Sequence, residues 1–336
     1  MNEKELLTAL GALAPLYQDQ TIGEIMVDAP DRVYVDRRAD LGWQLEDVAS
    51  PFKSREDIRA VIDTVFALEG IQLGPERTLA EMRFPDGSRM MATIPPTAPD
   101  GPCLVIRRML GWQTAVITWE KLLEFGSVTQ EAYEFLQRAI HANVTTLIAG
   151  GTGSGKTTLA NRIAELIPPD KRVIVVEGVH EMQVHHPRCI YLEAGGPANV
   201  SFGELAVKAS CMRPDWLVIG ELWGPEALSV LQLMSRGHVG LTNTHADSIQ
   251  DALDRLEAMC LMANLGLGLG EIRRTITSGL RLILYHEKLP EGRRVTQITE
   301  LRGLENDRYV LQPLFRYNHE KKLLEATGAK PSWESR

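Results

Sequence analysis

One nine-residue segment, Gly150–Thr158, restricts the possible folds of this chain more than any other feature. Its sequence, GGTGSGKTT, fits the pattern G-x-x-x-x-G-K-[ST] without a mismatch. An apolar, β-branched run precedes it at Val144–Ala149, and apolar residues at helical spacing follow it at Leu159–Ile167. Strand, glycine-rich loop and helix are the context in which this pattern cradles phosphate groups. The segment therefore predicts a nucleoside triphosphate site on a strand–loop–helix unit.

The residue types of this segment each suit a step in phosphate binding. Glycines let consecutive N–H groups turn toward the phosphates, and the helix N-terminus adds partial positive charge. Lys156 is expected to contact the β- and γ-phosphates, and the hydroxyl of Thr157 is expected to bind Mg²⁺. The residues predicted to bind the nucleotide are Gly150, Gly151, Thr152, Gly153, Ser154, Gly155, Lys156, Thr157 and Thr158.

Composition limits the class of protein. The length of 336 residues favours two domains, and 44% hydrophobic with 24% charged residues is typical of a globular protein. No run of eighteen apolar residues occurs, and the charged N-terminus does not resemble a signal peptide, so we expect a cytoplasmic protein. The four cysteines form no C-x-x-C pair, so no zinc site is expected. A net charge of −8 argues against a stable nucleic-acid partner.

Sequence pattern divides the chain at about residue 108. Residues 1–108 combine an opening helix with short alternating strands, which predicts a small α/β domain. Residues 109–117 are the expected linker. From residue 118 to 336, four-residue apolar strands alternate with helices, which predicts a parallel sheet covered on both faces.

Carboxylates follow two of these strands. Glu221 comes after the apolar strand Trp216–Ile219 and Gly220, where a carboxylate can hold Mg²⁺ or its water and polarise the attacking water. Glu177 and Glu181 follow the strand Val173–Val176 and are expected at the same edge of the sheet, in a role of polarising water or holding metal-bound water. A solvated loop carboxylate remains the alternative for this second pair.

Two histidines, His238 and His245, bracket a further expected strand that carries Thr242 and Thr244. Beside a triphosphate site, they are candidates for sensing the γ-phosphate or a neighbouring subunit. Their spacing and the lack of a third ligand argue against a metal site.

The order of these motifs resembles that of the secretion-superfamily traffic ATPases, the motors of type II and type IV secretion and of pilus extension or retraction. The resemblance covers nearly the whole chain. It rests on Gly150–Thr158, Glu177…Glu181, Met212–Asp215 with Gly220-Glu221 and Gly224–Ala227, and Gly237-His238…Thr244–Ala246. Glu24–Val27, Pro85–Arg89 and Ile106–Arg108 look especially like the tight-adherence pilus branch.

The resemblance implies a RecA-like P-loop ATPase domain that follows a smaller α/β, PAS-like domain. It implies ATP and Mg²⁺ as ligands, a homohexameric ring, and an inner-membrane platform protein as partner, with the ring at the inner face of the membrane. In this family Lys156 and Thr157 would bind phosphate and magnesium, and Glu221 would belong to the Walker B motif. Glu177 would belong to the Asp box, and His238 and His245 to the His box.

Charge that develops on the γ-phosphoryl group also calls for cations. Arg89, Arg107 and Arg108 are candidates because the family folds its N-terminal domain over the nucleotide. Arg107 and Arg108 are consecutive in a strand, so they should face opposite sides of the sheet. A solvated surface position is the alternative for each arginine.

The chain departs from the family pattern at two positions. Gly178 stands where the Asp box usually has Asp, and Trp223 stands where an Arg usually follows the Walker B glutamate. The leading interpretation is an ATP-driven secretion or pilus-assembly motor. The alternatives are a conjugative DNA-transfer motor and an ATP-binding regulatory subunit with weak hydrolysis.

Overall fold

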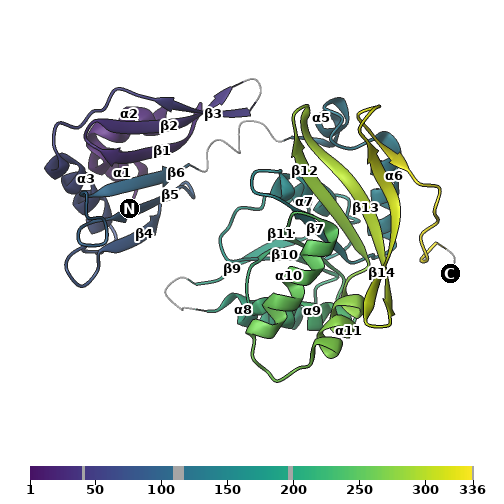
Figure 1. Cartoon of the computed structure of the whole chain (residues 1–336). Coiled ribbons are helices and arrows are strands. Elements are labelled where there is room, and N and C mark those ends of the chain that lie inside the picture. The colour runs from purple at the N-terminus through teal and green to yellow at the C-terminus, as the bar shows by residue number, and fades with distance from the viewer. Residues whose placement is uncertain (40–41, 109–116, 196–199, 335–336) are drawn as a thin grey trace. The chain divides into compact units, whose positions relative to one another are not determined.

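The structure is a computed structural model that describes residues 1–39, 42–108, 117–195 and 200–334 (Figure 1). The chain divides into two compact units, Met1–Val116 and Ile117–Arg336, and each is described by itself. Residues 109–116 of the expected linker lie outside the described residues. Within the described ranges, no helix is long and apolar enough to cross a membrane.

The N-terminal unit contains a six-stranded antiparallel sheet in the order β3-β2-β1-β6-β5-β4. Its strands are β1 (Ile22–Ala29), β2 (Arg32–Ala39), β3 (Gly42–Asp47), β4 (Leu79–Arg83), β5 (Arg89–Thr93) and β6 (Cys103–Arg107). Its helices are α1 (Glu3–Leu10), the short 3-10 helix η1 (Gly11–Leu13), α2 (Ala14–Gln18) and α3 (Arg55–Ala67).

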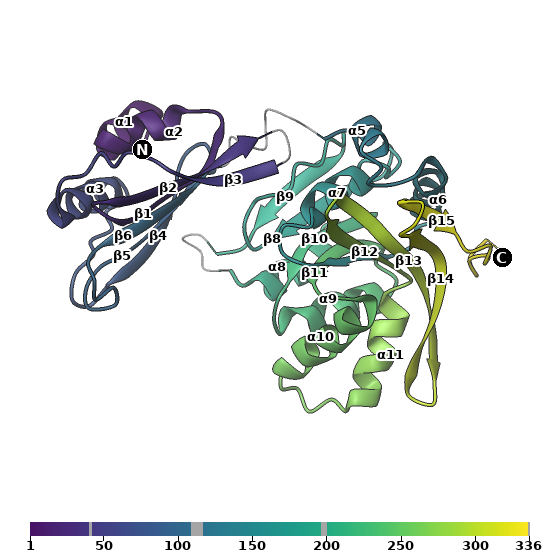
Figure 2. The same ribbon diagram turned by 45° about the horizontal axis from the view of Figure 1, so that its top comes forward.

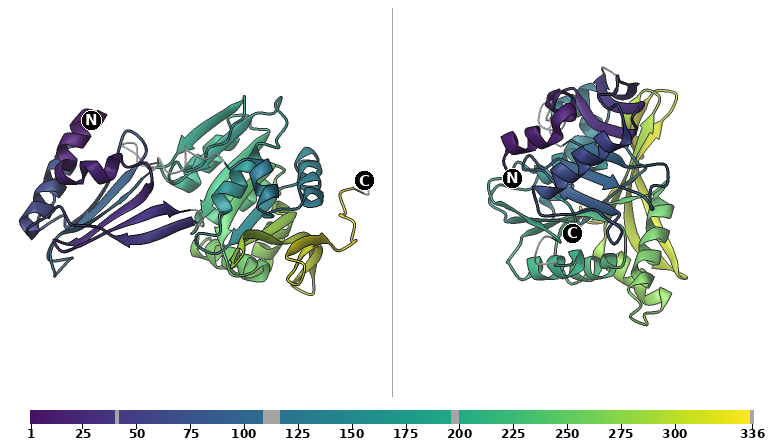
Figure 3. Two further views of the ribbon diagram at one scale, coloured as in Figure 1. Left: turned by 90° about the horizontal axis from the view of Figure 1, so that it is seen from above. Right: turned by 90° about the vertical axis from the view of Figure 1, so that its left-hand side faces the viewer.

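The helices of this unit pack on one face of the sheet (Figures 2 and 3). Side chains alternate between the two faces, so Met90 in β5 is buried while its neighbours Arg89 and Met91 are not. Helix α3 begins after Ser54, whose hydroxyl accepts a hydrogen bond from the Asp57 N–H in a capping box. The opposite face of the sheet therefore presents Arg89 and Arg107, two of the three arginines that the sequence singled out.

The C-terminal unit contains a nine-stranded sheet in the order β15-β14-β13-β12-β7-β11-β10-β8-β9. The strands from β12 to β9 are parallel, and β13, β14 and β15 extend the sheet in antiparallel pairing. The strands are β7 (Thr146–Gly150), β8 (Val173–Glu177), β9 (Cys189–Glu193), β10 (Trp216–Leu222), β11 (Gly240–His245), β12 (Leu282–Leu289), β13 (Gly292–Glu305), β14 (Arg308–Asn318) and β15 (Leu323–Ala326). The helices are α5 (Trp119–Glu124), α6 (Gln130–His141), α7 (Lys156–Ala164), α8 (Phe202–Ser210), α9 (Glu226–Ser235), α10 (Ile249–Met262) and α11 (Leu269–Gly279).

Helices cover both faces of the parallel strands, as predicted. In β7, Ile148 packs in the core shared with α6 and α7, whereas Leu147 and Ala149 pack in the core shared with α8 to α11. Burial on both faces explains why these strands read as continuous apolar runs. The predicted α/β fold class is confirmed, with the antiparallel strands β13 to β15 added to the parallel sheet.

The carboxyl ends of four parallel strands meet at one edge of this sheet. β7 ends at Gly150, β8 at Glu177, β10 just after Glu221, and β11 at His245. This is the edge at which open α/β sheets bind ligands.

Strands β7 and β12 approach so closely at Gly150 that a side chain there has no room. A Cβ atom would lie 2.1 Å from the carbonyl oxygen of His286. We therefore expect Gly150→Ala to lower the free energy of unfolding, measured by urea denaturation, by about 1–3 kcal/mol. Gly151→Ala is the matched control, because a Cβ atom there meets nothing within 4 Å. Equal stability of the two variants would contradict this account of the strand packing.

Candidate active site

The predicted phosphate loop connects β7 to α7. Gly153 and Gly155 have φ angles of 69° and 97°, a conformation that favours glycine. α7 begins at Lys156, and no side chain of the described residues caps its N-terminus. The loop and the helix therefore present backbone N–H groups and the positive end of the helix dipole, as an anion site requires.

The side chain of Lys156 folds back into this loop. Its Nζ donates hydrogen bonds to the carbonyl oxygens of Gly150, at 2.9 Å, and Gly151, at 3.0 Å. Nζ also lies 3.1 Å from Nδ1 of His245. Burial lowers the pKa of Lys156, and the Glu221 carboxylate partly opposes that shift. The ammonium group is thus held by acceptors of its own loop and by one histidine.

His245 connects Lys156 to Glu221. Its Nε2 lies 3.0 Å from Oε1 of Glu221. Because Nδ1 accepts a hydrogen bond from the ammonium group, the neutral ring carries its proton on Nε2, facing the carboxylate. Burial, then the charges of Lys156 and Arg255, lower the pKa of His245, which keeps this ring neutral. Lys156, His245 and Glu221 therefore form a continuous chain from the phosphate loop across β11 to β10.

The Glu221 carboxylate is half-buried beside this chain. Burial raises its pKa, Lys156 opposes the shift, and the carboxylate of Glu181 adds to it. Oε1 is buried and receives no well-aligned hydrogen bond from the described residues, although His245 lies at ion-pair distance. Glu221 thus retains an acceptor oxygen for a further ligand.

Glu177 differs from Glu221 because its own loop satisfies its carboxylate. Oε1 accepts hydrogen bonds from the N–H groups of Glu181, at 2.8 Å, and Met182, at 2.7 Å. Oε2 lies 2.8 Å from Nδ1 of His180. Burial raises the pKa of Glu177, and these hydrogen bonds counteract it. In this conformation Glu177 holds the segment after β8 in place, while Glu181 is exposed.

The two departures from the family pattern are both exposed. A Cβ atom on Gly178 would meet no described residue within 4 Å, so a larger residue would fit there. Trp223 is 73% exposed, and the carboxylate of Glu226 accepts hydrogen bonds from the N–H groups of Trp223 and Gly224. Neither position disturbs the contacts of Lys156.

The structure does not bring His238 together with His245. His238 precedes β11, whereas His245 ends it, so the strand separates them by its full length. His238 thus lies toward the opposite edge of the sheet from the phosphate loop, and its predicted contact with a neighbouring subunit stays a prediction.

The candidate arginines lie in the N-terminal unit. Arg107 in β6 lies opposite Arg89 in β5, and Arg89 lies opposite Arg83 in β4, so these three arginines form a row across the three strands. On its other side, Arg107 lies opposite Glu24 in β1. Arg107 lies 3.4 Å from Glu24, and Arg89 lies 3.5 Å from Glu81. The sequence did not single out Arg83, because only strand pairing reveals its place in this row.

Arg108 faces the opposite side of the sheet, as predicted. It is 2% exposed, donates hydrogen bonds to the carbonyl oxygens of Asp19 and Ile22, and lies over the ring of Tyr17. Its contacts make it part of the core of the N-terminal unit.

The phosphate loop is also contacted by two residues that the sequence pattern did not indicate. Nε of Arg293 donates a hydrogen bond to the carbonyl oxygen of Gly153 at 2.9 Å, and the His286 ring abuts Gly155. Both come from the β12–β13 hairpin, which the pairing of β12 with β7 carries to the loop. Local patterns give no signal for this contact.

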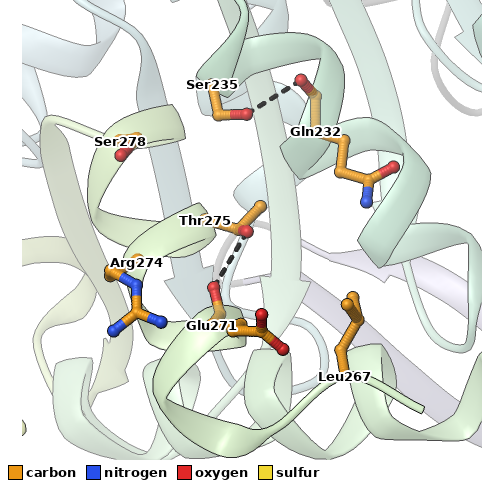
Figure 4. A pocket seen from close by; sticks show the side chains of 7 residues that line it. All are labelled: Gln232, Ser235, Leu267, Glu271, Arg274, Thr275 and Ser278. Atoms are coloured by element: carbon orange, nitrogen blue, oxygen red, sulfur yellow. Dashed lines mark hydrogen bonds between the residues drawn. The ribbon is translucent and has the colours of Figure 1, made fainter. Parts of the chain in front are cut away.

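A separate pocket of about 410 Å³ lies between α9 and α11 (Figure 4). It is lined by Gln232, Ser235, Leu267, Glu271, Arg274, Thr275 and Ser278. None of these residues belongs to the phosphate loop, so this pocket is distinct from the predicted nucleotide site.

The phosphate loop at the edge of an α/β sheet, with Glu221 on the neighbouring strand, defines a P-loop nucleoside triphosphatase. Residues 7–297 match the family of type II/IV secretion system proteins. The chain belongs to this family and is an ATPase of it, so the predicted superfamily is confirmed.

Individual relatives cover most of the chain. It is 28% identical to the conjugal transfer protein TrbB of Rhizobium radiobacter over 311 residues, 91% of this chain and 92% of the relative. It is 30% identical to the type IV secretion system protein PtlH of Bordetella pertussis over 278 residues, 75% of this chain and 80% of the relative.

Solved structures show the same fold at lower identity. The pilus retraction motor PilT with bound ADP matches 88% of this chain and 84% of its own at 15% identity, with a TM-score of 0.59. The ATPase DotB of Legionella pneumophila matches 91% and 79% at 17% identity, with a TM-score of 0.56.

The environment of His245 predicts a measurable titration. Its folded-state pKa lies below the usual histidine value of about 6.5, so the protein loses stability from this group as pH falls below that value. NMR of labelled histidine should therefore give a pKa for His245 below about 6.5. Lys156→Met should raise it, because one nearby cation is removed, whereas Lys208→Met, a control at an exposed position in α8, should not. A wild-type value at or above the usual one would contradict the neutral ring.

Proposed function

We propose that the chain is one subunit of a hexameric motor that uses ATP and Mg²⁺ to power protein secretion or pilus assembly. The observation that carries the proposal is the chain of contacts from Lys156 through His245 to Glu221 at the phosphate loop. It links the group that would bind the γ-phosphate to the group that would polarise water. Family membership and the names of the relatives support the secretion role.

In this proposal Lys156 leaves the carbonyl oxygens of Gly150 and Gly151 and neutralises the β- and γ-phosphates. Its departure also frees Nδ1 of His245, and a ring protonated at Nδ1 can donate a hydrogen bond to the γ-phosphate. Glu221 orients and polarises the attacking water, for which its raised pKa is suited. Glu177 positions the segment that carries Glu181.

The donor groups fit Mg²⁺. The hydroxyl of Thr157 lies in the first turn of α7, and Oε1 of Glu221 lacks a well-aligned hydrogen bond, so both offer the hard oxygen atoms that this ion prefers. Thr157 would bind the ion directly, and Glu221 partly through water. When bound, the ion would neutralise charge on the phosphates.

Several forms of the motor remain open within the proposal. Resemblance of the N-terminal segments to the tight-adherence branch favours a pilus system, in which the ring would act on an inner-membrane platform protein from the cytoplasmic side. Similarity to the conjugal transfer protein TrbB favours a conjugative system. The net charge of −8 argues against direct DNA binding, so DNA should leave turnover unchanged.

Substitution of the two central residues separates binding from turnover. Lys156→Ala should abolish ATP binding, because it removes the charge that faces the phosphates. Glu221→Gln should retain binding but stop turnover, since an amide cannot polarise water as a carboxylate does. Fluorescent-nucleotide titration and phosphate release measure the two effects, with the exposed Lys208→Ala and Glu124→Gln as controls. Turnover of Glu221→Gln at the wild-type rate would exclude Glu221 as the catalytic carboxylate.

The ring should be visible in solution. A closed ring requires complementary surfaces on two different faces of each subunit. Light scattering with an ATP analogue and Mg²⁺ should give a mass near six times the 37.4 kDa of one chain. A monomer that persists at tens of micromolar would contradict the motor, whereas weak turnover by a complete ring would favour the regulatory subunit.

The arginine row should matter for the chemical step. Arg89→Ala and Arg107→Ala should depress turnover more than ATP affinity, because the cation is needed most in the transition state. In other triphosphatases a single arginine finger raises the rate about 10³–10⁵-fold. Because other cations lie nearby in a ring, we expect each substitution here to lower turnover by about 10³-fold or less. Arg32→Ala, an exposed arginine at the start of β2, is the control. Near-wild-type rates for both variants would show that these arginines are ordinary surface residues with no role in hydrolysis.

A further inference from the structure

His286 is a buried polar side chain that has no hydrogen-bond partner among the described residues. It lies on β12, is 3% exposed, and neither ring nitrogen is bonded. Burial above all, with the charges of Arg293, Lys156 and Arg294, lowers its pKa to about 3. The ring is therefore neutral and has one donor and one acceptor to offer.

Strand pairing aims this ring at the phosphate loop. β12 pairs with β7 as far as Tyr285, and the register between β12 and β13 shifts between Tyr285 and His286. Such bulges re-aim side chains and occur often beside active sites. The carbonyl oxygen of His286 abuts Gly150 at the start of the loop. A Cβ atom on Gly155, near its end, would lie 3.2 Å from Cε1 of the ring.

Ser154 is a second buried polar group in the same place. It is 1% exposed, and its Oγ has no partner among the described residues. A Cβ atom on Gly150 would lie 2.8 Å from this Oγ and 2.1 Å from the His286 carbonyl oxygen, so the two residues flank one backbone position. Buried polar groups are normally bonded, because leaving them unbonded costs free energy. Two such groups beside one loop indicate a second loop conformation that bonds them.

We propose that His286 is a positioning residue of the phosphate loop, whose ring forms a hydrogen bond with the Ser154 hydroxyl when nucleotide binds. Lys156 bonds the Gly150 and Gly151 carbonyl oxygens in the conformation described here, and its transfer to phosphate releases this part of the loop. The new bond then fixes the phosphate-binding shape of the loop. It ties the loop to the β12–β13 hairpin, which already holds Gly153 through Arg293.

Thermal stability and nucleotide affinity together test the proposal. Without nucleotide, Ser154→Ala and His286→Leu should keep the wild-type Tm or exceed it, because neither side chain loses a partner. With an ATP analogue and Mg²⁺, each should raise Kd about three- to tenfold, the effect of one net hydrogen bond. The double variant should bind no more weakly than the weaker single variant. His286→Gln, which keeps a donor and an acceptor, should restore most of the affinity.

The controls are His141→Leu and Ser278→Ala, both at exposed positions outside the phosphate loop. Lower Tm values without nucleotide, combined with unchanged Kd, would assign both side chains to packing alone and overturn the proposal. Additive losses in the double variant would overturn it as well, because they would show that Ser154 and His286 act independently.

Discussion

The ammonium group of Lys156 is the point on which the rest of the site depends. It bonds two carbonyl oxygens of its own loop and the imidazole of His245, and through that ring it reaches Glu221. A buried cation needs such partners, because desolvation is costly without them. These partners attract the ammonium group less strongly than a triphosphate would, because the triphosphate carries full negative charges. The loop therefore has a conformation that is stable by itself and that a nucleotide can displace.

The sheet makes this arrangement possible by bringing distant segments to one edge. β7, β11 and β10 are neighbours, so the loop after β7, His245 at the end of β11 and Glu221 near the end of β10 meet without long connections. β12 lies on the other side of β7 and contributes His286 and Arg293. Both sides of the loop are thus held by parallel pairing, and β7, β10 and β11 are buried along almost their whole length.

Much of this site could be predicted because its motifs follow local strand patterns. The phosphate loop, Glu177 and Glu221 each follow or end an apolar run that reads as a strand, and His245 ends a strand that carries Thr242 and Thr244. Residues that strand pairing brings into place could not be found in this way. Arg83 joins the row of arginines only through the antiparallel register of β4 and β5, and His286 reaches the phosphate loop only because β12 pairs with β7. Strand β3 also gives little local signal, because Gly42–Asp47 has few apolar residues and lies at the edge of the sheet.

A structure of the protein with a non-hydrolysable ATP analogue and Mg²⁺ would show whether nucleotide displaces the contacts of Lys156. We expect Nζ of Lys156 to leave the carbonyl oxygens of Gly150 and Gly151 and to lie within hydrogen-bond distance of β- and γ-phosphate oxygens. We also expect the side chain of Glu221 to face the γ-phosphate. A nucleotide bound while Lys156 keeps both carbonyl contacts, or bound away from the loop, would contradict the proposed role of Lys156.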